Sequence, residues 1–143
     1  MCIEDSLVPQ TFTGRCHCGV ISYESSSELI APHYCHCGDC RRLYGSVGAG
    51  FVVLEEHTRI RGDYGSYTST SDSGNRKTHL FCGQCGSPLG ELVDAFPGTL
   101  VLVPGTLDDQ SLFKPEAHFW TSRKAPWQVI ADGLEQLAEQ PSM

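Results

Sequence analysis

The sequence of 143 residues has no long run of apolar residues. A helix that crosses a membrane needs close to 20 consecutive, predominantly apolar residues, and no segment here approaches that length. The opening MCIEDSLVPQ is acidic and contains a proline, so it lacks the basic start and apolar stretch of a secretory signal. We therefore expect a cytoplasmic protein without a membrane partner.

Positive charge is also scarce. Ten Lys and Arg stand against 17 Asp and Glu, which gives a net charge of −7. An acidic chain is repelled by nucleic acid and by anionic membrane surfaces, so a nucleic-acid partner is not expected. A small anionic ligand would need a local cluster of cationic side chains. The clusters in the sequence are Arg41-Arg42, Arg76-Lys77 and Arg123-Lys124.

Helical patterns are few, and strand patterns dominate. Short segments rich in β-branched and aromatic residues alternate with Gly and Pro turns, which predicts short antiparallel strands. These segments are 11–27, interpreted as a hairpin, and 29–37, 47–54, 58–70, 76–82 and 99–107. Residues 39–45 predict a helical turn with Asp39 as its N-cap, and 133–140 has helical character.

The fold class predicted from these patterns is mainly β. No long-period repeat and no linker divides the chain, and 40% of its residues are hydrophobic. That is enough for one core. We expect one zinc-stapled domain over residues 1–143, with short tails at 1–10 and 131–143.

Cysteine is abundant, with eight residues. A reducing compartment keeps ordinary disulfides open, so metal-bound thiolates are the favoured explanation. Apart from Cys2, the cysteines form three groups. They are Cys16 with Cys18, then Cys35 with Cys37 and Cys40, and finally Cys82 with Cys85.

The two cysteine pairs together supply four ligands. A structural zinc site is closed by four protein ligands, and the glycine after each pair gives the backbone the freedom to turn. We predict a structural zinc on Cys16, Cys18, Cys82 and Cys85, worth about 10 kcal/mol in small zinc domains. A redox role for the CxxC at Cys82 and Cys85 is less favoured, because no helix N-terminus is expected there to lower a thiol pKa.

The middle group, in 35-CHCGDCRR-42, has only three cysteines. Catalytic zinc typically keeps three protein ligands and leaves a fourth place for water or substrate. We predict a catalytic zinc on Cys35, Cys37 and Cys40, hence two zinc ions per chain. Three alternatives stay open: His36 or His33 is the fourth ligand, Cys2 fills that place, or the site holds no metal. In an extended segment His36 would point away from its two cysteine neighbours.

Several motifs together resemble the glutathione-dependent formaldehyde-activating enzyme family, which includes centromere protein V. They are 14-GRCHCG-19, 35-CHCGDCRR-42, 81-FCGQCGSPL-89, 105-GTLDD-109 and 118-HFWTSRKAPW-127. The resemblance covers about residues 12–128. It implies a mainly β fold similar to the Rab exchange accessory factor and methionine sulfoxide reductase B. It also implies the same two zinc ligand sets that the cysteine count predicts.

The resemblance implies a carbon–sulfur lyase that joins formaldehyde to the thiol of glutathione. We accordingly expect a zinc-dependent enzyme of this type, acting on an adduct of glutathione or a similar small thiol. The alternative is a non-catalytic zinc-binding module that contacts a protein partner.

The candidate catalytic residues lie near the cysteine motifs in sequence. They are His36, Arg41, Arg42 and His118, with Tyr44 as a further possible proton donor. The two arginines suit the carboxylate of a peptide-like thiol, because a guanidinium pairs with a carboxylate through two hydrogen bonds. Trp120 and Trp127 are expected to pack in the core rather than line a pocket, and His17 is expected only to separate two ligands.

Overall fold

The computed structural model describes residues 11–71 and 74–140. Cys2 and the predicted tail at 1–10 lie outside the described residues. Within them the mainly β prediction is confirmed, with eleven strands and one α-helix. That helix, α1 (Gly38–Tyr44), has seven residues, and no helix of the described part is long and apolar enough to cross a membrane.

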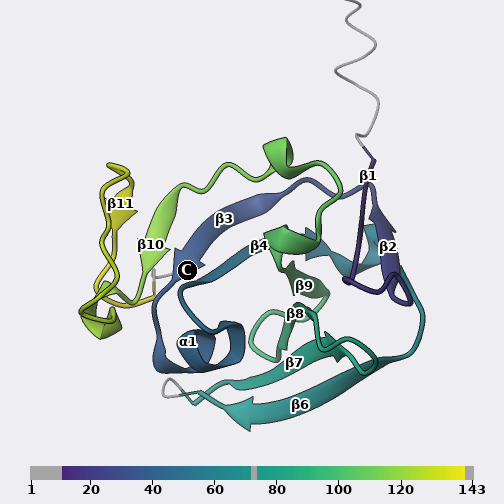
Figure 1. The fold of residues 1–143 in the computed structure, drawn as a ribbon, viewed down its shortest axis with the longest axis horizontal. Helices are drawn as coiled ribbons and strands as arrows, with labels where there is room; N and C mark the ends of the chain where they lie inside the picture. The colour runs from purple at the N-terminus through teal and green to yellow at the C-terminus, as the bar shows by residue number, and fades with distance from the viewer. Residues whose placement is uncertain (1–10, 72–73, 141–143) are drawn as a thin grey trace, which may run out of the picture.

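The strands form two sheets. Their bounds are β1 (Phe12–Arg15), β2 (Ser22–Ser25), β3 (Ile30–Cys35), β4 (Gly48–Leu54), β5 (Thr58–Arg61), β6 (Tyr64–Thr70), β7 (Arg76–Cys82), β8 (Pro88–Val93), β9 (Thr99–Leu102), β10 (Ala117–Phe119) and β11 (Glu135–Gln136). The smaller sheet has the order β1-β2-β5, and the larger has the order β11-β10-β3-β4-β9-β8-β7-β6. In Figure 1, α1 lies between the end of β3 and the β6–β7 hairpin.

Most strand pairs are antiparallel, and β10 is the exception. It runs parallel to β3 on one side and to β11 on the other. The chain reaches β10 from β9 through two 3-10 turns, η3 (Pro104–Thr106) and η4 (Gln110–Leu112). This long connection allows β10 to enter beside β3 in the parallel direction. As a result, residues 117–119 lie next to the cysteine-rich end of β3.

The two sheets share one hydrophobic core. Phe12 and Tyr23 of the smaller sheet are buried in the same cluster as Phe51 of the larger one. The Phe12 ring meets both of the other rings edge-on, with centroids 6.5 Å from Tyr23 and 5.9 Å from Phe51. Each large apolar side chain buried in this way contributes about 1.5–3 kcal/mol. The remaining members of the cluster are Cys16, Ile21, Val53, Leu80, Cys82, Leu89, Leu100, Leu102 and Leu107.

The predicted helical features need two corrections. Helix α1 exists, but its N-cap is Cys37, whose sulfur accepts the backbone N–H of Cys40; Asp39 lies in the first turn instead. Its negative charge suits the positive end of the helix. Residues 133–140 form no helix, and only the short β11 is regular there. The backbone N–H of Leu137 bonds to the carbonyl of His118 (2.8 Å), so pairing with β10 outweighs a helix too short to be stable alone.

Other strand boundaries also differ from those predicted. The segment 58–70 divides into β5 and β6, which belong to different sheets, and Gly62 at the break has a φ of 102°. The predicted strand 99–107 ends at Leu102 and continues as the turn η3. Strands β8 and β10 were not predicted. The hairpin within 11–27 is confirmed as the antiparallel pair β1–β2.

Candidate metal centres

Four cysteine sulfurs from two hairpin turns meet at one point. Cys16 and Cys18 lie in the β1–β2 turn, and Cys82 and Cys85 begin the β7–β8 turn. All four sulfurs lie within 4.8 Å of one another, with 3.6 Å between Cys16 and Cys18 and 3.7 Å between Cys18 and Cys82. A tetrahedral zinc with bonds of about 2.3 Å would set its sulfurs about 3.8 Å apart. This cysteine quartet therefore fits zinc.

The two turns of the quartet are built alike. Gly19 and Gly86 follow the cysteine pairs in the left-handed conformation, with φ of 84° and 80°, which favours glycine. Backbone N–H groups point at the sulfurs, since Ile21 donates to Cys16 (3.3 Å) and Cys85 donates to Cys82 (3.4 Å). Such donors stabilise negative charge on sulfur. None of the described cysteines forms a disulfide.

Three further sulfurs form a second cluster, the cysteine trio. Cys35 ends β3, Cys37 caps α1 and Cys40 lies in the first helical turn, and their sulfurs lie within 4.8 Å of one another. Hydrogen bonds from Cys35 and Cys40 lower the pKa of Cys37. The bond to Cys37 raises the pKa of Cys35, and the bonds to Cys35 and then to Cys37 raise that of Cys40. The trio thus favours a thiolate at Cys37, the form that binds metals.

No imidazole nitrogen belongs to the trio among the described residues. His36 is buried, with 4% of its surface exposed, and its Nε2 lies 2.8 Å from Nδ1 of His118. The Nδ1 of His33 lies 2.7 Å from the carbonyl of Ala31. Burial lowers the pKa of His36, and the neighbouring charges of His118 and Lys124 add to the effect. His36 and His33, the two histidines considered as a fourth ligand, are thus hydrogen-bonded to groups outside the trio.

A small cavity of about 50 Å³ opens beside the trio. Its lining residues are Cys37, Gly38, Asp39, Ser71, Lys77, Trp120 and Gln140. The cationic side chain in this lining is Lys77. Arg41 and Arg42 lie in the last turn of α1, one helical turn from the lining residues Gly38 and Asp39.

A buried carboxyl group, that of Glu91, lies close to Tyr44 of α1 and was missed by sequence reasoning. The hydroxyl of Tyr44 donates to Glu91 Oε1 (3.2 Å), and burial raises the pKa of both residues. Burial alone would lower the pKa of Lys77, but the negative charges of Glu91 and the trio outweigh it and raise that pKa. The one signal in the sequence was a glutamate within the otherwise apolar strand PLGELV.

The remaining predicted residues are distributed as follows. Trp127 is 63% exposed, so the prediction that it packs in the core is wrong. Trp120 is partly buried and lines the cavity, with the Arg123 guanidinium 5.6 Å from its ring centroid. His17 is exposed and donates its backbone N–H to Ser87 (2.9 Å). It lies between two cysteines of the quartet, as expected.

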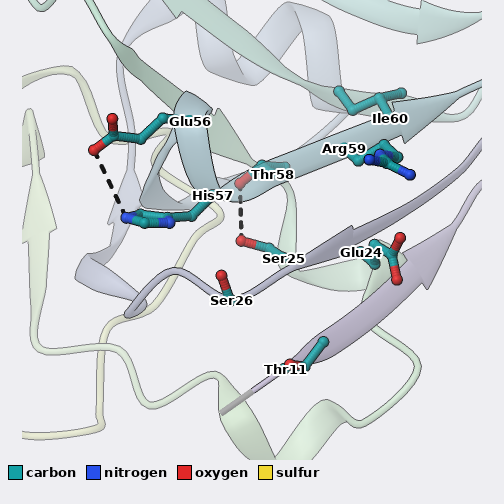
Figure 2. A pocket seen from close by; sticks show the side chains of 9 residues that line it. All are labelled: Thr11, Glu24, Ser25, Ser26, Glu56, His57, Thr58, Arg59 and Ile60. Atoms are coloured by element: carbon teal, nitrogen blue, oxygen red, sulfur yellow. Dashed lines mark hydrogen bonds and ion pairs between the residues drawn. The ribbon is translucent and has the colours of Figure 1, made fainter. Parts of the chain in front are cut away.

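A larger hollow of the described surface lies away from both clusters. Figure 2 shows the side chains that line it, several of them on β2 and β5; Ser25 bonds to Thr58 (2.8 Å), and Glu56 pairs with His57 (3.6 Å) just before β5. It measures about 720 Å³ and is lined by Thr11, Glu24, Ser25, Ser26, Glu56, His57, Thr58, Arg59 and Ile60. No cysteine contributes to this hollow, so its volume alone does not identify it as a site for thiol chemistry.

Comparison with known proteins agrees with this arrangement. A crystal structure of a Rhodobacter sphaeroides protein shares the fold with a TM-score of 0.55 and 22% sequence identity, over 72% of this chain and 96% of that chain. The family model described as "Glutathione-dependent formaldehyde-activating enzyme" matches residues 11–123, which contain both cysteine clusters. The chain therefore belongs to the glutathione-dependent formaldehyde-activating enzyme family.

Proposed function

We propose that the protein is a zinc-dependent carbon–sulfur lyase-type enzyme acting on an adduct between a small thiol, such as glutathione, and formaldehyde or another small electrophile. The observation that carries this proposal is the contrast between the two clusters. The quartet offers four sulfurs, enough to close a site, whereas the trio offers three, and its Cys37 lines a small cavity. A hollow of about 480 Å³ also borders Cys16 of the quartet, so the number of ligands carries the contrast. A closed site suits a structural metal and a three-ligand site suits a catalytic one.

In this proposal the quartet and the trio each hold one zinc ion, two per chain. The quartet joins the β1–β2 turn to the β7–β8 turn and stabilises a single domain. Cys35, Cys37 and Cys40 would hold a zinc ion that, as a Lewis acid, would lower the pKa of a thiol in the fourth place. The chain's own residues then position the rest of the substrate.

Positioning falls to the cationic residues around the cavity. Lys77 lines the cavity next to Cys37, and its charge suits both the thiolates and an anionic substrate group. We propose that Arg41 and Arg42, in the last turn of α1, bind a carboxylate of a peptide-like thiol, since a guanidinium holds a carboxylate through paired hydrogen bonds. His36 and His118 are proposed as residues of the same site, because His36 lies between Cys35 and Cys37 in the sequence and its ring is hydrogen-bonded to His118.

The reaction balances without an outside oxidant or reductant. The sulfur of the thiol forms a bond to the carbonyl carbon, the carbon–oxygen π pair moves to oxygen, and the proton lost by the thiol ends on that oxygen. In the reverse direction the carbon–sulfur bond breaks and the carbonyl is restored. Orienting the two reactants can supply several kcal/mol of the barrier. A reducing compartment such as the cytoplasm would supply the thiol and protect both clusters.

The test is a panel of glutathione adducts incubated with the zinc-loaded protein, with released glutathione measured by mass spectrometry. We expect release from at least one hydroxymethyl-type adduct above the uncatalysed rate. Cys37→Ser should abolish this acceleration, whereas Ser26→Ala, remote from both clusters, should retain it. The absence of acceleration across the panel would favour the alternative, a non-catalytic zinc module that binds a protein partner.

A further inference from the structure

Three side chains form a continuous hydrogen-bonded chain that ends beside the trio. His36 Nε2 lies 2.8 Å from His118 Nδ1, and His118 Nε2 lies 2.7 Å from Asp132 Oδ2. The two histidines are 4% and 5% exposed, while the aspartate side chain is 40% exposed. This hydrogen-bonded series of side chains therefore runs from the protein surface to the interior.

The carboxylate at the outer end determines the direction of both hydrogen bonds. An ionised carboxylate only accepts, so His118 donates from Nε2. In a neutral ring the Nδ1 of His118 then accepts, and His36 donates to it from Nε2. A ring nitrogen that carries a proton has no lone pair for a metal, so this arrangement removes Nε2 of His36 as a ligand. The Nδ1 of His36 keeps its lone pair, but this nitrogen does not belong to the trio.

Each of the three side chains is also held in place by neighbouring groups. The His118 ring stacks on Tyr34, with centroids 4.8 Å apart, and on His36, with centroids 5.1 Å apart. The backbone N–H of His36 donates to the carbonyl of Phe119 (2.9 Å). Asp132 is held in turn, because its other oxygen accepts the backbone N–H of Leu134 (3.0 Å). His36 is thus restrained at its backbone and at its ring.

This restraint matters because of where His36 stands. Imidazole is a common zinc ligand, and a ligand set of three cysteines and one histidine is a standard closed site. His36 lies between two cysteines of the trio, so in sequence it is the nearest candidate to close that site. Strand alternation directs its side chain to the opposite side from theirs. The bond to His118 gives the ring a buried partner there.

We propose that His118 and Asp132 are positioning residues that hold the imidazole of His36 away from the cysteine trio and so keep the fourth metal place available to an external thiol. The inference rests on the proposed function, since it takes the trio as the zinc site that receives the thiol. It assigns Asp132, outside every cysteine motif, a part in that site.

Cadmium in place of zinc provides a direct test, because cadmium NMR gives a separate line for each site and its shift reports the sulfur and nitrogen ligands. In the wild type we expect no coupling between cadmium and imidazole ring protons at the trio. In His118→Ala we expect this coupling to appear, and glutathione to bind the trio about tenfold or more weakly, the scale on which residues that orient metal ligands act. The double variant His36→Ala with His118→Ala should regain the wild-type ligand set and glutathione binding.

Asp132→Ala tests the same inference at an exposed position where folding is less at risk. Like His118→Ala, it should introduce coupling between cadmium and imidazole ring protons and weaken glutathione binding at the trio, but to a smaller extent. The inference is overturned if His118→Ala and Asp132→Ala keep the wild-type cadmium line and glutathione affinity. It is also overturned if the double variant remains as impaired as His118→Ala. Failure of glutathione to bind the wild-type trio would count against the proposed function instead, and the imidazole coupling would still decide the inference.

Discussion

Gly48 lies directly against Cys40, opposite Cys35 across the β3–β4 pair. A Cβ atom at Gly48 would stand 2.7 Å from the Cβ of Cys40 and 3.2 Å from its sulfur. The first distance is shorter than side-chain carbons tolerate, so the trio requires glycine here. The packing of β4 against α1 thus helps to set the position of one predicted metal ligand.

Gly48→Ala is therefore expected to displace Cys40 and weaken metal binding at the trio. Overpacking of this kind typically costs about 1–3 kcal/mol. Zinc transfer to a chromophoric chelator should show one weakened site and one unchanged site. Gly38→Ala is the matched control, because a Cβ at Gly38 meets no atom within 4 Å. Equal zinc retention by both variants would contradict the prediction.

Replacing one cysteine in each cluster should have different consequences. Cys85→Ser removes a ligand from the quartet, and metal binding of about 10 kcal/mol is comparable with the whole stability of a domain. We expect this variant to be largely unfolded. Cys37→Ser should retain its circular dichroism spectrum and lose about one zinc ion per chain. Unfolding of Cys37→Ser would instead identify the trio as a second structural site.

Lys77→Met removes the positive charge from the cavity next to Cys37. Because that charge offsets the negative charge of the thiolates, we expect zinc affinity at the trio to fall by about tenfold. Lys77→Arg should retain most of the affinity. Competition with a chelator measures the change, with Lys114→Met as an exposed control. An unchanged affinity in Lys77→Met would show that its charge does not act on the trio.

The buried carboxyl of Glu91 predicts a pH dependence of stability. Burial raises its pKa above the ordinary value of 4.5, although Lys77 opposes the shift. The folded chain then keeps this proton to higher pH than the unfolded chain. The stability contributed is complete below the unfolded pKa and is lost as pH rises through the folded pKa.

Glu91→Gln should remove this loss. The free energy of unfolding of the variant, relative to the wild type, is expected to increase as pH rises above the ordinary carboxyl pKa of 4.5. Urea unfolding of the zinc-loaded proteins at each pH measures it. Glu135→Gln, on the exposed β11, is the control. A difference between Glu91→Gln and wild type that stays constant with pH would contradict the prediction.

Local features were predictable because neighbours in sequence determine them. The spacing of Cys82 and Cys85 with a following glycine predicted a tight turn, and the structure places that turn at the end of β7. The same holds for Cys16 and Cys18 in the first hairpin. Helix α1 was foreseen, but its cap was assigned to Asp39 instead of Cys37, because the ability of a sulfur to accept a hydrogen bond was not considered.

Pairings between strands that lie far apart in the sequence could not be predicted from local residue patterns. The parallel position of β10 beside β3 brings His118 to His36, and short strands of this kind give weak patterns. Asp132 reaches His118 only because residues 135–136 pair with β10. The group of Lys77, Glu91 and Tyr44 is assembled from β7, β8 and α1. The sequence of each element alone does not predict this group.

By itself, the sequence determined how many cysteines each cluster has, because spacing and glycine placement set which thiols can share one turn. Four from two pairs form the quartet and three form the trio. The tertiary structure alone decided what surrounds them. Strand order placed His36 against His118, with Asp132 behind them, and brought Lys77 to the cavity beside Cys37. Those contacts depend on packing between segments far apart in the chain, which local residue preferences do not specify.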